Sequence, residues 1–75
     1  MSNLDKYNEV FLSLFNSKDV TSLKYGSNGW DSAGHLILIT ELEKIFDIKL
    51  ELEEVLNFKS YKHGIPILKN HGIGI

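Results

Sequence analysis

Ser32 is the residue whose type and surroundings are best suited to chemistry in this sequence. It follows Trp30 and Asp31 at the junction between a polar segment and the strongest helical pattern, and the small residues Ala33 and Gly34 come next. Small neighbours leave a hydroxyl accessible to an approaching enzyme. The free amides and partial positive charge of a helix N-terminus also suit a phosphodiester on that hydroxyl. Asp and Ser are equally the residue types that cap helices, so the local pattern alone favours an N-cap pair over a modified residue.

The histidines and acids give weaker candidates. His35, His63 and His71 match no compact zinc spacing, and the chain has no cysteine to complete such a site. We expect these imidazoles to face solvent or to pack loosely. The acids between residues 51 and 54 could form a carboxylate pair for acid–base catalysis, but acids at the start of a short helix are a common structural choice.

Composition and length exclude several classes of function. The chain has 75 residues, of which 43% are hydrophobic, so it is expected to form one small domain over residues 1–75. A core and a walled catalytic pocket rarely fit in this length, so we expect a binding or carrier module and not an enzyme. No segment has the length of a membrane span or the pattern of a signal peptide, so the cytoplasm is the expected compartment.

The charge pattern argues against nucleic-acid binding. The net charge is −2, and all eight cationic side chains are lysines. Residues 31–54 hold seven acids against Lys44 and Lys49, so the best predicted helix lies in a segment of net charge −5. A helix-turn-helix DNA-binding protein would need a positive surface there.

The first half of the chain predicts a helix followed by a long loop. Apolar residues over residues 4–14 recur at spacings of three and four, with Ser2 or Asn3 as the expected N-cap. Residues 16–30 are rich in Asn, Ser, Gly and Asp and predict a loop held by single apolar side chains, with Tyr25 and Trp30 partly exposed. A strand at residues 23–25 would have no partner nearby. The apolar stripe of the helix is Leu4, Tyr7, Val10, Phe11 and Leu14.

A second helix is expected to begin after its N-cap, Asp31 or Ser32, and its apolar pattern runs from Leu36 to Phe46. A connection over residues 47–52, anchored by Ile48 and Leu50, then leads to a short helical turn near residues 53–58. The stripe expected to face the core on the second helix is Leu36, Ile39, Leu42 and Phe46, widened by Leu38 and Ile45.

Ser60 could cap a last helix, but Gly64 and Pro66 interrupt its pattern. Proline inside a helix removes an amide and clashes with the carbonyl four residues back, at about 3 kcal/mol. We therefore expect a break between Tyr61 and Pro66, with the helix running from about Pro66 to Asn70. The fold expected from these elements is an all-α, small four-helix bundle with a long first loop and a short third helix.

From Trp30 to Leu68 the sequence resembles the acyl carrier protein family. A short Asp-Ser signature would be a weak signal, but here it is joined to ungapped downstream spacing that is typical of the family. The element order and the chain length are also similar to that family. The residues that carry the resemblance are Asp31, Ser32, Leu36, Ile39, Leu42, Glu43, Phe46, Ile48, Leu50, Glu53, Glu54, Ser60 and Ile65.

The resemblance implies a covalent cofactor on Ser32. A phosphopantetheinyl transferase would move 4'-phosphopantetheine from coenzyme A to this serine, with Asp31 helping to present it. The terminal thiol would then carry an acyl or aminoacyl group as a thioester, the chemistry of fatty acid biosynthesis and related lipid metabolism. The implied partners are that transferase, a ligase that loads the acyl or aminoacyl group, and acyltransferase or synthase enzymes that dock on a monomeric carrier.

The resemblance places partner docking on the exposed face of the second helix. Family members commonly have Leu after the serine, where this chain has Ala33, and many fatty-acid carriers have acids where it has Ile37 and Lys44. These departures favour a dedicated carrier for one pathway over bulk fatty-acid synthesis. This docking surface comprises Ala33, Leu36, Ile37, Thr40, Glu41 and Lys44. Leu36 also belongs to the apolar stripe, so we expect it to divide its contacts between the core and this surface.

Two questions stay open at the level of the sequence. The load could be a fatty acyl group, a hydroxyacyl group or an amino acid, because no residue distinguishes them. An unmodified helical adaptor that binds partner proteins through Ile37, Ile45 and the acidic face is the alternative function.

Overall fold

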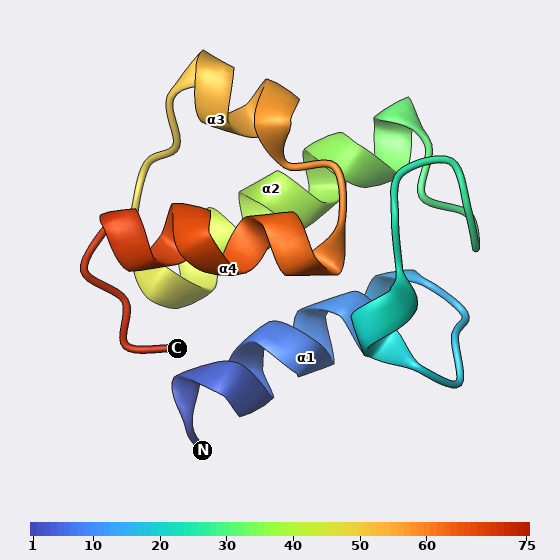
Figure 1. The fold of residues 1–75 in the computed structure, drawn as a ribbon, viewed down its shortest axis with the longest axis horizontal. Helices are drawn as coiled ribbons and strands as arrows, with labels where there is room; N and C mark the ends of the chain where they lie inside the picture. Colours follow the sequence, from blue (N-terminus) through green and yellow to red (C-terminus); the bar gives the residue numbers. More distant parts are fainter.

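The computed structural model describes residues 1–75 as an all-α protein, which confirms the expected fold class. Figure 1 shows α4 between α1 and α3, with the two chain ends near each other. The Asn3 side chain donates to the Gly74 carbonyl at 3.1 Å and so joins the two ends. The elements in chain order are α1 (Asn3–Leu14), the 3-10 helix η1 (Val20–Ser22), α2 (Ser32–Phe46), α3 (Leu52–Asn57) and α4 (Tyr61–Asn70).

Helix α1 begins where the sequence predicts. The Ser2 hydroxyl accepts a hydrogen bond from the Asp5 amide and satisfies one of the free donors of the first turn. Tyr7, Val10 and Phe11 are buried, as the three-and-four spacing of their apolar side chains requires. Leu4, which belongs to the same expected stripe, lies near the helix start and is exposed.

Most of the apolar stripe expected on α2 faces the core, including Ile39, Leu42 and the partly buried Phe46, but two of its members do not. The buried residues of the helix are Leu38, Ile39 and Leu42, whereas Leu36 is 65% exposed and Ile45 is also exposed. The helix is apolar on nearly every side, so the periodicity alone could not tell which side would face the core. Of the two places expected for Leu36, the core and the docking surface, the structure selects the docking surface, because Leu36 lies almost opposite Leu38 around the helix axis.

Helix α4 runs without a break through Pro66, which contradicts the expected break and late start at Pro66. Its N-cap is Ser60, whose hydroxyl accepts from the His63 amide at 3.0 Å. The helix is anchored on both sides of the proline, by buried Tyr61 before it and by buried Leu68 after it. Tertiary packing of both halves outweighs the local cost of the proline.

The long loop has a partner that the sequence did not reveal. Lys24 and Ser60 form an isolated antiparallel bridge, in which the Tyr25 amide donates to the Lys59 carbonyl at 2.8 Å and the Tyr61 amide donates to the Leu23 carbonyl at 2.9 Å. The expectation of no partner near residues 23–25 failed because the pairing segment lies immediately before α4, far along the chain.

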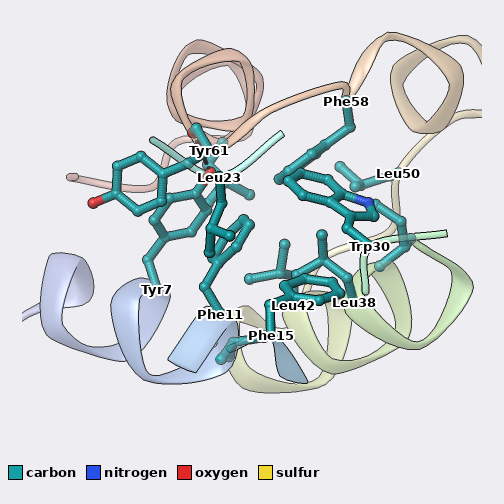
Figure 2. Packing of buried hydrophobic residues seen from close by; sticks show 13 residues of the cluster. Tyr7, Phe11, Phe15, Leu23, Trp30, Leu38, Leu42, Leu50, Phe58 and Tyr61 are labelled. Atoms are coloured by element: carbon teal, nitrogen blue, oxygen red, sulfur yellow. Dashed lines mark hydrogen bonds between the residues drawn. The ribbon is translucent and has the colours of Figure 1, made fainter. Parts of the chain in front are cut away.

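An aromatic cluster forms the centre of the core (Figure 2). The Phe11 ring lies 4.9 Å from the Tyr7 ring and 5.5 Å from the Trp30 ring, measured between centroids. Trp30 is only 1% exposed, so its expected partial exposure is wrong, while Tyr25 is 46% exposed as expected. The Tyr7 hydroxyl donates to the Tyr61 carbonyl at 2.6 Å, and burial raises the pKa of the Tyr7 phenol, which keeps this donor protonated.

No helix in the structure has both the length and the apolar character needed to cross a membrane.

Gly64 explains how closely α4 approaches the aromatic cluster. A Cβ at this position would lie 2.2 Å from the Phe58 ring and 2.2 Å from the Tyr7 hydroxyl oxygen. We expect Gly64→Ala to lower the free energy of unfolding by about 2 kcal/mol, because overpacking outweighs the gain in helix propensity. Denaturant unfolding measures this change. Gly74→Ala, where a Cβ meets nothing within 4 Å, is the matched control. Equal stability of the two variants would contradict the packing role.

Candidate functional site

Ser32 is the first residue of α2 and its side chain is exposed. Asp31 precedes it as the N-cap, and the Asp31 carboxylate accepts from the Gly34 amide at 2.8 Å. The sequence left Asp31 and Ser32 as alternative caps, and the structure selects Asp31. The Ser32 hydroxyl is therefore left without a capping role at the positive end of a 15-residue helix.

The segment before Ser32 is fixed by backbone hydrogen bonds and by the burial of Trp30. The Trp30 amide donates to the Ser27 carbonyl at 2.9 Å, and the Gly26 amide donates to the Trp30 carbonyl at 2.8 Å. The Trp30 ring stacks on the Phe15 ring with 5.2 Å between centroids. Because Trp30 lies two residues before Ser32, these contacts determine where α2 begins and where the exposed serine is placed.

Gly34 allows the loop to lie directly against the start of α2. A Cβ on Gly34 would lie 3.2 Å from the Gly29 carbonyl oxygen and 3.2 Å from the Phe15 ring. Gly34, the second of the two small residues after Ser32, therefore has a packing role in addition to leaving space around the hydroxyl.

A groove of about 770 Å³, which we call the Ser32 groove, lies beside the serine. It is bounded by the loop, α2, α3 and the start of α4. Its apolar wall comprises Tyr25, Leu36, Leu52, Val55, Leu56 and Phe58. Ser32, His35 and Ser60 also line it, together with the basic side chains Lys24, Lys59 and His63. An elongated apolar group attached at Ser32 could contact the apolar side chains along this groove.

The residues of the predicted docking surface lie along the outer side of α2. Ala33, Leu36, Ile37, Thr40 and Lys44 are exposed, and Glu41 is half-buried. Lys44 lies 3.9 Å from the Glu41 carboxylate, one helical turn away; the Lys44 side chain is mostly exposed and the Glu41 side chain is about half exposed. Such an exposed pair contributes little to stability, so Lys44 is free to respond to a partner. The structure thus brings the predicted residues to one surface beside Ser32.

His35 is a residue of this site that sequence reasoning missed. The expectation of a solvent-facing or loosely packed ring is wrong for it. The Trp30 indole nitrogen donates to His35 Nδ1 at 3.0 Å, and His35 Nε2 lies 2.8 Å from the Val55 carbonyl oxygen. The ring therefore connects the loop before Ser32 to α3 across the Ser32 groove. No sequence signal marks it, because Val55 contributes its backbone.

The other two histidines also have defined partners. His63 Nδ1 lies 2.9 Å from the Ser60 hydroxyl, and His71 Nε2 lies 2.9 Å from the Glu54 carboxylate. Glu54 also accepts from the Glu51 amide at 2.9 Å and completes a capping box at the start of α3. This agrees with the structural interpretation of the acids in residues 51–54. No group of three or more metal-binding side chains is assembled.

Comparisons with protein-family models, with curated proteins and with solved structures found no match to this chain.

The start of α3 should depend on pH through Glu54. The hydrogen bond from the Glu51 amide, followed by that with His71, lowers the pKa of the Glu54 carboxyl. Because folding favours the ionised carboxylate, Glu54 stabilises the fold at pH values above the ordinary carboxyl pKa. This stabilisation disappears as the pH falls through the lowered pKa of Glu54. We therefore expect Glu54→Gln to reduce the free energy of unfolding near neutral pH and to differ less from the wild type in acid.

Urea unfolding across a pH series measures the difference. Glu53→Gln removes a neighbouring exposed acid and serves as the control. A pH-independent deficit in Glu54→Gln would show that lost packing, and not the ionised carboxylate, causes the change.

Proposed function

We propose that this protein is an acyl or aminoacyl carrier that bears 4'-phosphopantetheine on Ser32. The observation that carries the proposal is the position of Ser32, which is exposed, released from capping by Asp31, and placed at the first position of α2 beside the Ser32 groove. The sequence between Trp30 and Leu68 also resembles acyl carrier proteins, and this resemblance supports the same function.

The residues around Ser32 fit a phosphodiester. The amides of Ser32 and Ala33 belong to the first turn of α2, where backbone donors have no partner within the helix, and the Asp31 side chain engages Gly34 instead. These amides and the helix dipole favour the negative charge of a phosphate group attached to the serine oxygen. The apolar wall of the groove offers contact to the arm and its load.

The modification step is a phosphoryl-type transfer onto Ser32. Its Oγ forms a bond to the phosphorus of the phosphopantetheine group, and the pyrophosphate bond of coenzyme A breaks. The bisphosphorylated nucleoside leaves, and the serine proton passes to a base that the transferase supplies. The bound arm supplies a thiol, which this cysteine-free chain otherwise lacks, and that thiol holds the load as a thioester.

The chain's own residues present the load without catalysing a reaction. Tethering raises the effective concentration of the load at any enzyme that docks on the carrier. Asp31 and Glu41 attract basic partners toward Ser32, whereas Lys44 opposes them. This charge pattern supports a dedicated carrier in one pathway, which meets its transferase, its loading ligase and its acyltransferase or synthase through the docking surface.

The exposed apolar residues Ile37 and Ile45 favour one second candidate, an unmodified helical adaptor. Such a protein would bind partners through the outer side of α2 and would never gain a prosthetic group. The mass of the protein after incubation with a transferase separates the two functions.

Ser32→Ala should abolish modification while the fold stays intact. Wild-type protein incubated with coenzyme A, magnesium and a phosphopantetheinyl transferase should gain the mass of one phosphopantetheine group, and the variant should gain none. Because Asp31 is the cap, we expect the free energy of unfolding to change by less than about 0.5 kcal/mol.

Ser27→Ala and Ser60→Ala are the matched controls, and both should be modified like the wild type. Ser60 caps α4, so that variant is expected to be less stable but still modified. Modification at Ser27 or Ser60, or no modification of wild type by any transferase tried, would favour the adaptor.

Lys44→Glu should speed modification by a transferase of the fatty-acid pathway. The basic surface of the transferase would meet an acidic side chain at position 44 in place of the positively charged lysine. This change raises the association rate most at low salt. Steady-state rates at two ionic strengths measure this effect. Lys18→Glu makes the same change of net charge in the exposed loop after α1 and should have a smaller effect. Slower modification of Lys44→Glu, or a gain that persists at high salt, would contradict the electrostatic role.

A further inference from the structure

Helix α3 forms one wall of the Ser32 groove but has little hydrophobic attachment to the protein. It is six residues long and none of them is buried. Leu52 and Leu56 are 74% and 63% exposed, and only Val55 turns an apolar side chain toward the core. A helix this short is not stable alone, so its position depends on the specific contacts that hold it.

His35 provides one of those contacts and also reaches the loop before Ser32. The centroid of its ring lies 6.0 Å from that of the buried Trp30 indole and 6.3 Å from that of the Phe58 ring. Its two nitrogens bond in opposite directions, Nδ1 to the Trp30 indole and Nε2 to the Val55 carbonyl. A single imidazole therefore joins the segment that fixes Ser32 to the helix that faces it.

The partners of His35 leave only one protonation state. The indole nitrogen can only donate, so His35 Nδ1 must accept and carries no proton. The Val55 carbonyl can only accept, so Nε2 must donate and carries the proton. The arrangement thus requires a neutral ring with its hydrogen on Nε2.

Protonation would break one of these two bonds. In the imidazolium both nitrogens are donors, so Nδ1–H would face the indole N–H of Trp30. Trp30 is buried, and its indole would lose its acceptor with little access to water. The Val55 bond would persist only if the ring stayed in place against this repulsion.

Few charged groups face the ring. Tyr25 contacts it from the loop through its ring edge, at 5.6 Å between centroids. Asp31, on the previous turn of α2, directs its carboxylate to the Gly34 amide. Lys24, Lys59 and His63 line the same groove from the loop and from the start of α4. On α3, the Glu54 carboxylate binds His71 instead.

We propose that neutral His35 is a positioning residue that holds the Ser32 loop and α3 together, and that a proton on its Nδ1 releases this connection. The release itself follows from the chain alone. Its effect on modification at Ser32 rests on the proposed carrier function.

The wild-type protein gives the first test. Trp30 is the only tryptophan, so its indole N–H gives a single NMR cross-peak. This cross-peak should shift with pH in step with the His35 Cε1 proton resonance. His63→Asn, which removes another histidine of the groove, should leave the titration unchanged. An indole signal that does not follow His35 would overturn the proposal.

Two variants then separate the two hydrogen bonds at one fixed pH. In His35→Asn the carboxamide oxygen can replace Nδ1 but no group reaches Val55, so amides of α3 should exchange about tenfold faster while the indole stays protected. In His35→Gln the amide nitrogen can replace Nε2, so the indole should exchange about tenfold faster while α3 stays protected. Identical exchange patterns in the two variants would overturn the separate roles of the nitrogens.

Modification by a transferase at the same pH gives the functional readout. We expect His35→Gln, which loosens the loop before Ser32, to be modified several-fold more slowly than His35→Asn. Equal rates would overturn the positioning of Ser32 by His35. If no transferase modifies wild-type protein, the carrier function fails, but the indole titration and the exchange patterns still decide the connection between the loop and α3.

Discussion

The burial of Trp30 is the interaction on which the rest of this structure depends. Its ring contacts Phe11 from α1, Phe15 at the C-cap of α1 and Phe58 from the segment after α3, with centroids 5.2 to 6.4 Å apart. A large aromatic side chain contributes several kcal/mol when it leaves water, which a loop cannot obtain from polar contacts. Since Trp30 adjoins the cap of α2, this burial fixes the direction in which α2 leaves the loop. The exposed position of Ser32 is a consequence of the buried position of its near neighbour.

The loop needs a second attachment because ordering a chain costs about 1 to 2 kcal/mol per residue. Leu23 supplies it, with a buried side chain and a carbonyl that accepts from the Tyr61 amide. The bridge of Lys24 with Ser60 places the loop against the start of α4. The two attachments, at Leu23 and Trp30, leave only a short segment between them. Turns at Gly26 and Gly29, both at positive φ, fold this segment back toward the core.

Local patterns predicted what local physics decides, and they failed where distant contacts decide. Ser2 and Asp31 are caps because their side chains reach nearby amides, and this short-range geometry let the sequence place each cap to within two adjacent residues. The continuous α4 was not predictable, because the cost of Pro66 is local while its compensation comes from Tyr61 and Leu68 packing on other elements. At the site, the exposure of Ser32 followed from its neighbours. The contacts of His35 did not, because they join an indole and a backbone carbonyl that have no common sequence pattern.

The two sides of the Ser32 groove are held to the core unequally: the loop before Ser32 is anchored by a buried side chain and α3 is not. This difference suits the proposed carrier. The serine is positioned by a buried tryptophan, so every partner enzyme would meet the same hydroxyl in the same place. The opposite wall of the groove, α3, has no buried residue, and elements with few buried contacts open at low free-energy cost. A rigid α3 would need Leu52 and Leu56 to be buried, which would fill the groove with the protein's own side chains. Their exposure therefore keeps apolar surface available for a load, and the stability lost in α3 is offset by polar contacts that include the hydrogen bond from His35 to Val55.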